Sequence, residues 1–185
     1  ILEGQRHYFR SGATLPVRFR VAMLKKLYAG VQKFQAEIQT ALQKDLGKSD
    51  FEGFMCETGL VLSEIHYMIK HVRRFAAERR VHTPLAQFVS RSYQKLSPLG
   101  NVLIMSPWNY PFLLTISPLA NAIAAGNTAI VKPSAYSPAT SRVIAQLLGE
   151  CFPAVFVAAV TGGRQENAAL LEEKFDFVFF TGSQA

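Results

Sequence analysis

The sequence has few of the features that mark secreted, metal-binding or membrane-spanning proteins. Its 185 residues include only two cysteines, Cys56 and Cys151, and neither belongs to a closely spaced group of cysteines and histidines. This composition excludes a disulfide framework of the secreted kind and gives no support to a zinc site, so we expect no bound metal. The longest apolar stretch, residues 112–125, is interrupted by polar residues and a proline, and it is too short to span a membrane. The first residues do not form a signal peptide, which predicts a cytoplasmic protein.

Acidic residues are also scarce, with 13 against 20 basic residues and a net charge of +7. Part of the excess lies in the pairs Arg73-Arg74 and Arg79-Arg80. A nucleic-acid surface would interleave such charges with aromatic residues that stack on bases, whereas the neighbouring Phe75 fits the buried stripe of a helix. The pattern therefore favours a solvated helix face and predicts no nucleic-acid partner.

Two long amphipathic helices are predicted at the start of the chain. Apolar residues recur every three or four positions from Pro16 to about Asp45, and Gly47 is suited to end this helix. The second helix begins with Ser49 and Glu52 in the spacing of a capping box and continues to Phe75. The apolar stripe of the first helix comprises Leu24, Leu27, Val31, Phe34, Ile38 and Leu42. The stripe of the second comprises Met55, Thr58, Val61, Leu62, Ile65, Met68, Ile69, Val72 and Phe75.

Residues 83–99 differ from the helices around them. Pro84 and Pro98 flank a segment with a patchy alternation of apolar and polar residues. Such a pattern favours extended chain, either a hairpin or an edge strand that seeks a partner.

From Gly100 onward, short apolar runs alternate with helical patterns. Strands are predicted at residues 101–105, 128–131, 155–160 and 177–180, and helices at 112–125, from Ser137-Pro138 to before Pro153, and at 165–174. Alternation of this kind indicates a parallel sheet with crossover helices. The predicted fold is a doubly wound, Rossmann-like α/β domain preceded by the two helices. A further helix should follow the turn at Gly182, so we expect a fold truncated before completion.

Residues suited to ligand binding follow each predicted strand. In an open parallel sheet, ligands bind beyond the carboxyl ends of the strands, where glycines, hydroxyls and helix amides can hold phosphate groups. Neither a G-x-G-x-x-G nor a Walker-type sequence is present. The residue pattern alone leaves nucleotide binding and ordinary turns equally open. The four turns contain Ser106-Pro107-Trp108-Asn109, Lys132-Pro133-Ser134, Thr161-Gly162-Gly163 and Thr181-Gly182-Ser183.

In order along the chain, four blocks make the sequence similar to the aldehyde dehydrogenase superfamily. The most specific begins with Pro98-Leu99-Gly100 and leads into Pro107-Trp108-Asn109-Tyr110-Pro111. The opening, with residues 8–12 and 45–48, resembles the class 3, fatty-aldehyde-like branch. Three further blocks follow. The second begins with Ala125-Gly126-Asn127-Thr128 and leads into Lys132-Pro133-Ser134, the third is Val160-Thr161-Gly162-Gly163, and the fourth is Phe179-Phe180-Thr181-Gly182-Ser183.

The resemblance implies oxidation of a small-molecule aldehyde with NAD or NADP. In that chemistry a cysteine thiolate attacks the carbonyl, hydride leaves for the nicotinamide, and water releases the acid from a thioester. Asn109 matches the amide that donates to the developing oxyanion, and Tyr110 matches a residue of the substrate channel. The positions that match the cofactor cleft are Ser106, Pro107, Trp108, Lys132, Ser134, Gly163, Phe180, Gly182 and Ser183.

The sequence departs from the family pattern in two respects. Ala135 replaces a glutamate that binds the adenosine ribose in many relatives, which leaves the choice between NAD and NADP open. The family's general-base glutamate and nucleophilic cysteine match no position of this chain, and Cys56 and Cys151 are expected to be structural.

We therefore expect residues 1–185 to be the amino-terminal part of the NAD(P)-binding domain, without the catalytic domain and inactive alone. Residues 83–99 resemble the family's oligomerisation arm, and the parent is expected to be a homodimer. The alternative is a complete, non-catalytic nucleotide-binding or oligomerisation module.

Overall fold

Four parallel strands form the centre of the computed structural model, which describes residues 1–183. They are β3 (Asn101–Met105), β4 (Thr128–Lys132), β5 (Val157–Ala159) and β6 (Phe177–Phe180), in the spatial order β5-β4-β3-β6. The strand order and parallel pairing confirm the predicted doubly wound α/β fold. The helix expected after Gly182 lies outside the described residues.

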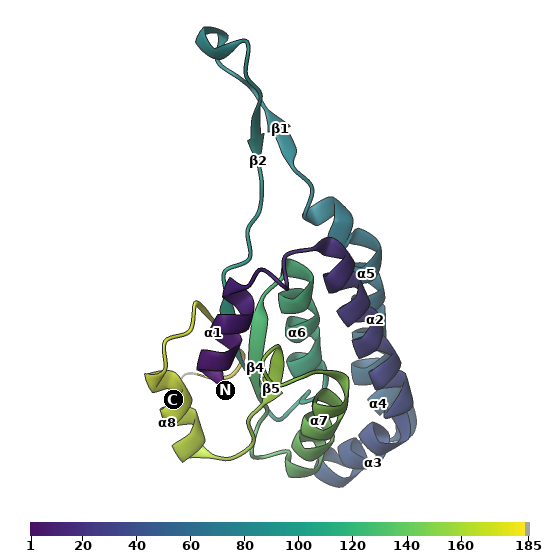
Figure 1. Ribbon diagram of the computed structural model, residues 1–185. Coiled ribbons are helices and arrows are strands. Elements are labelled where there is room, and N and C mark those ends of the chain that lie inside the picture. The colour runs from purple at the N-terminus through teal and green to yellow at the C-terminus, as the bar shows by residue number, and fades with distance from the viewer. Residues whose placement is uncertain (184–185) are drawn as a thin grey trace.

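Successive side chains of the central strands pack on opposite faces of the sheet. Val102 and Ile104 join the larger core with α6 (Leu113–Ala125) and α7 (Pro138–Cys151). Leu103 and Met105 point to the other face. There they pack with residues of α1 (Leu2–Arg10) and near α8 (Arg164–Glu172). Figure 1 shows these two helix layers on either side of the strands.

Helix α1 was not predicted. Only Leu2 and Gln5 of its nine residues are buried, so its apolar stripe is too short to recognise. The Gln5 side chain donates to the carbonyl oxygens of Ala129 and Ala154, at 3.0 and 2.9 Å. Long-range contacts therefore place this helix on the sheet.

The predicted first long helix is divided in two. It consists of α2 (Val17–Lys33) and α3 (Gln35–Leu46), with Phe34 between them at φ −91° and ψ 12°. The predicted apolar stripe is buried throughout. The division lets the stripe follow different partners, because α2 packs on α5 (Gly59–Phe75), α6 and α7, whereas α3 packs mainly on α7.

The predicted second helix contains a π-helical insertion. A single α-helical turn, α4 (Asp50–Gly53), leads into the π-helical segment η1 (Phe54–Thr58) and then α5. Ser49 accepts a hydrogen bond from the Glu52 N–H, which is one of the two bonds of the predicted capping box. The insertion shifts the helical phase, so the predicted core residue Met55 is 52% exposed, whereas Glu57 is fully buried.

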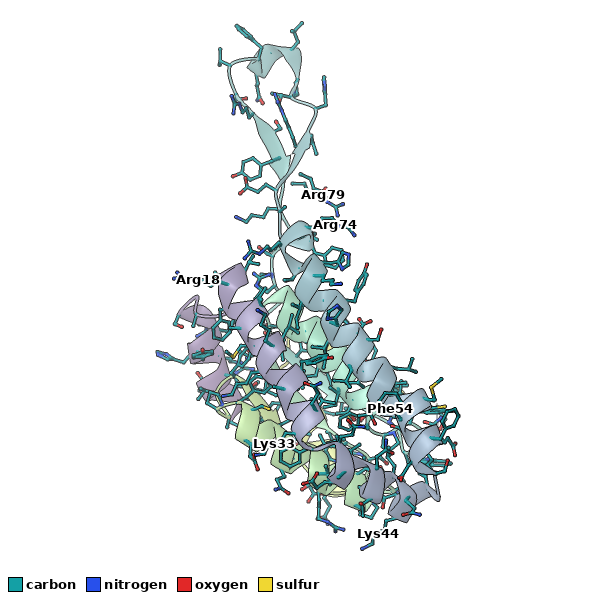
Figure 2. The ribbon with its side chains drawn as sticks, turned by 90° about the vertical axis from the view of Figure 1, so that its right-hand side faces the viewer. Arg18, Lys33, Lys44, Phe54, Arg74 and Arg79 are labelled. Carbon is teal, nitrogen blue, oxygen red and sulfur yellow. The ribbon has the colours of Figure 1, made fainter. Side chains whose placement is uncertain are left out.

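The segment after α5 forms a projecting hairpin. β1 (Arg79–Val81) pairs antiparallel with β2 (Ser92–Gln94), and a short 3₁₀ turn, η2 (Leu85–Gln87), lies at the tip. The extended segment was predicted, but the placement of Arg79 and Arg80 on a helix was wrong, because α5 ends at Phe75 and both arginines pair with β2. Figure 2 shows Arg74 on the helix and Arg79 at the base of the hairpin, well above Lys33 and Lys44.

No helix within residues 1–183 combines the length and apolar character needed to cross a membrane.

Candidate functional site

The carboxyl ends of the four strands meet at one edge of the sheet. The Ser106 N–H, after β3, donates to the Lys132 carbonyl at 3.2 Å, and the Thr181 N–H, after β6, donates to the Met105 carbonyl at 3.0 Å. The Val160 N–H, after β5, bonds the Val131 carbonyl at 2.9 Å. The four predicted turns therefore lie side by side at the edge where α/β sheets bind ligands.

The turn after β3 presents its side chains outward. Trp108 is 54% exposed and Tyr110 is 40% exposed, Asn109 is exposed, and Pro107 is half-buried. The Asn109 Oδ1 accepts the Tyr110 N–H at 3.1 Å. Within residues 1–183 its Nδ2 donates no hydrogen bond, so this amide group is available to an incoming oxygen atom.

Ser106 has a different environment from the rest of this turn. Its hydroxyl is buried and lies 2.5 Å from the Thr115 hydroxyl, which also bonds the Pro111 carbonyl at 2.6 Å. These contacts join the beginning and end of the turn to α6. The Ser106 side chain therefore helps to fix the conformation of the turn. Its direct contact with a cofactor stays a prediction.

Lys132 is enclosed at the end of β4. It is 3% exposed, and its Nζ donates to the carbonyl oxygens of Pro133 and Gly162 at 3.1 and 2.6 Å. Burial lowers the pKa of this ammonium group, and the nearby Glu166 carboxylate opposes that effect. Since an ammonium has three N–H groups, one remains for a ligand such as a sugar hydroxyl.

Ser134 lies two residues beyond Lys132 and is half-buried. Its hydroxyl accepts the Tyr136 N–H at 3.2 Å, and its carbonyl accepts the Ser141 hydroxyl at 2.7 Å. The side chain is held at the edge and its O–H can still donate.

The turn into α8 carries a carboxylate at the start of the helix. The Glu166 Oε2 accepts the Gly163 N–H at 2.6 Å, and Glu166 is only half exposed. Hydrogen bonds from its own N–H and from the Gly163 N–H lower the pKa of this carboxyl. Gly162 adopts φ 131°, and a side chain there would overlap Glu166. The Glu166 carboxylate is therefore held at the start of α8.

The turn after β6 is the most open part of the site. Phe180, Gly182 and Ser183 are all exposed. A side chain at Gly182 would collide with the Phe180 ring. These three positions lie beside the turn after β3, since β6 pairs with β3.

Beneath the turn after β3 lie two charged residues that sequence reasoning missed. Lys48 and Glu57 form a buried ion pair with 2.5 Å between Nζ and Oε1, and Lys48 also donates to the Asn109 carbonyl at 3.1 Å. The Lys48 Nζ lies 4.1 Å from the centre of the Tyr110 ring. The available signal was a lysine directly after a helix-ending glycine and a glutamate within an apolar stripe.

Neither cysteine is placed to act as a nucleophile at this edge. Cys151 is the last residue of α7, about 20 Å along the helix from its first residue, and α7 begins at the site. Burial raises the pKa of its thiol. Cys56 is half-buried within η1, not at a strand end. Within residues 1–183, no group of His, Cys, Asp and Glu side chains is placed to hold a metal ion.

Comparison with known proteins gives a family whose defining model matches residues 2–185, described as the aldehyde dehydrogenase family. The chain belongs to the aldehyde dehydrogenase family. It is 42% identical over 96% of its length to 4,4'-diaponeurosporen-aldehyde dehydrogenase of Staphylococcus aureus, and 41% identical over 97% to mouse aldehyde dehydrogenase family 3 member A2. These stretches cover 39% and 37% of the two relatives, so the chain spans about two fifths of their length.

The fold of this chain also agrees with solved structures. A structure described as the substrate-bound state of Staphylococcus aureus AldH superimposes with a TM-score of 0.95 and 41% identity, over 98% of this chain and 40% of that one. The predicted resemblance to the family and to its family 3 members is therefore confirmed.

Proposed function

We propose that this chain is the amino-terminal, cofactor-binding part of an NAD(P)-dependent aldehyde dehydrogenase, and that the whole enzyme oxidises an aldehyde to a carboxylic acid. One observation carries the proposal. The exposed amide of Asn109 lies at the same sheet edge as the buried ammonium group of Lys132, with neighbouring strands supplying the two residues. This arrangement offers an oxyanion donor next to a cleft suited to a nucleotide.

The residues at the edge fit a dinucleotide. Lys132 and Ser134 would donate to the adenosine ribose, for which each has an unused donor. Gly163, Gly182 and Ser183 would allow the pyrophosphate to approach the backbone, while Ser106, Pro107, Trp108 and Phe180 would line the cleft. When bound, the nicotinamide supplies the acceptor for the hydride that leaves the aldehyde carbon.

In the proposed reaction, Asn109 acts on the substrate oxygen. Attack on an aldehyde places negative charge on that oxygen, and the neutral Nδ2 donor stabilises it without bringing a charge into the site. Tyr110, next along the turn, would face the substrate channel. Because neither Cys56 nor Cys151 is placed to attack, we propose that residues 1–185 alone do not oxidise aldehydes.

The proposal also covers the oligomeric state of the whole enzyme and its location in the cell. The hairpin exposes Leu85, Phe88 and Val89 at its tip, each more than three quarters exposed. We propose that it contacts a second copy in a homodimer of the whole enzyme, since exposed apolar tips of this kind mark protein contacts. A cytoplasmic location is proposed for the whole enzyme as well.

Nucleotide binding can be tested on residues 1–185 because Trp108 is the only tryptophan. We expect NAD or NADP to change its fluorescence with weak affinity, and Lys132→Ala to abolish the change. Lys25→Ala, an exposed lysine on α2, is the matched control and should bind normally. If neither nucleotide changes the fluorescence of a folded chain, the cofactor assignment is contradicted. If this chain oxidises an aldehyde, the proposal that it lacks a catalytic nucleophile is refuted.

A further inference from the structure

The Lys48–Glu57 pair is the most deeply buried charge pair among residues 1–183. The side chains are 8% and 0% exposed, whereas both partners of the surface pair Lys33–Glu150 are well exposed at the same 2.5 Å separation. A buried ion pair gives little net stability, because the desolvation of both charges offsets their attraction. Burial of this pair beneath an exposed turn therefore requires another explanation.

Each charged group of the pair also bonds one end of the turn that contains Asn109. The Lys48 ammonium donates to the Asn109 carbonyl at 3.1 Å. The Glu57 Oε2 accepts the N–H groups of Phe112 and Leu113, at 2.8 and 3.1 Å, where α6 begins. A carboxylate at a helix amino terminus is favoured by the unpaired amides and the helix dipole. The same ion pair thus holds the backbone before and after Tyr110 and Pro111.

The local backbone is shaped to bring these two side chains inward. Gly47 ends α3 at φ 68°, a left-handed conformation that turns the chain immediately before Lys48. The π-helical segment η1 buries Glu57, while Phe54 of the same segment is 41% exposed. Figure 2 shows Phe54 on the outer side of this helix. Such insertions are frequent at functional sites.

We propose that Lys48 and Glu57 are positioning residues that fix the direction of the Asn109 side-chain amide. The inference rests on the proposed function, in which that amide donates to the aldehyde oxygen. Lys48 holds the backbone carbonyl of Asn109, and the Tyr110 N–H, in the same stretch of backbone, holds its Oδ1. Fixing this backbone therefore fixes the side-chain amide as well, with Nδ2 left as the free donor. Loss of either charge frees the Asn109 carbonyl or leaves the other charge buried without a partner.

The first test uses residues 1–185 and requires no activity. Lys48→Met should shift and broaden the ¹H–¹⁵N resonances of the Asn109 side-chain amide, while Lys33→Met, which breaks the exposed pair, should leave them unchanged. If Lys48→Met does not fold, the same measurement is made on Glu57→Gln. This variant removes the negative charge of the pair but keeps an oxygen acceptor for the Phe112 N–H. Unchanged Asn109 resonances in a folded variant would overturn the proposal whether or not the chain belongs to an active enzyme.

The second test uses the whole enzyme of the proposed function. Lys48→Met should lower kcat by about tenfold to a hundredfold with little change in the KM for cofactor, as expected when a donor is misplaced by about an ångström. In an Asn109→Ala background the same substitution should have no further effect on kcat. Equal losses in both backgrounds would show that Lys48 acts only on stability. An Asn109→Ala enzyme with normal kcat would instead contradict the proposed function.

Discussion

The Asp45 carboxylate caps the amino terminus of α7 by bonding Thr140 twice. Its Oδ2 lies 2.7 Å from the Thr140 nitrogen and 2.9 Å from the hydroxyl, and its Oδ1 accepts the Ala139 N–H at 3.1 Å. The side chain of Ser137, the residue directly before α7, makes no capping bond and donates to the Ser134 carbonyl instead. Asp45 and Glu57 thus hold the starts of both helices that follow central strands of the site.

Removal of the Asp45 carboxylate should destabilise the fold. Asp45→Ala leaves two helix amides and a hydroxyl without their partner, and we expect a loss of about 1–2 kcal/mol in the free energy of unfolding. Urea unfolding followed by circular dichroism measures this change. Glu173→Ala, at an exposed position after α8, is the control and should be close to neutral. A neutral Asp45→Ala would show that water replaces the cap without cost.

Glu166 should make the start of α8 sensitive to acid. Its carboxyl pKa is lowered by hydrogen bonds from its own N–H and the Gly163 N–H. A lowered carboxyl pKa means that the stabilisation is present above the ordinary value of 4.5 and is lost as pH falls through the lowered value. The Gly163 amide resonance should therefore titrate below pH 4.5, and Glu166→Gln should remove the titration. A Gly163 resonance that titrates identically in Glu166→Gln would contradict the hydrogen bond's role.

Gly30 and Cys151 should show strong energetic coupling. A Cβ at Gly30 of α2 would overlap the Cys151 Sγ of α7. Gly30→Ala alone should be destabilising, although alanine favours a helix over glycine by about 1 kcal/mol. In a Cys151→Ala background the overlap disappears and Gly30→Ala should be neutral or stabilising. A double-mutant cycle on unfolding free energies should give a coupling of about 1–3 kcal/mol, and additive effects would exclude the steric contact.

Local patterns in the sequence determined the alternation of strands and helices and the four turns of the site. The apolar strand around Leu103 and the helix stop at Gly126 follow from periodicity and backbone preference over a few residues, so both could be predicted before the fold was known. The residues of the Asn109 turn were also specific enough to indicate the family.

The tertiary structure alone decided how those turns are held. The strand order and the position of α1 depend on contacts between segments that are far apart along the chain. The same is true of the hydrogen bonds made by Asp45, Lys48 and Glu57. Sequence periodicity carries no information on such contacts, because a charged residue has the same local pattern whether it faces solvent or a buried partner. Asn109 could therefore be recognised from the sequence, but the ion pair beneath it could not.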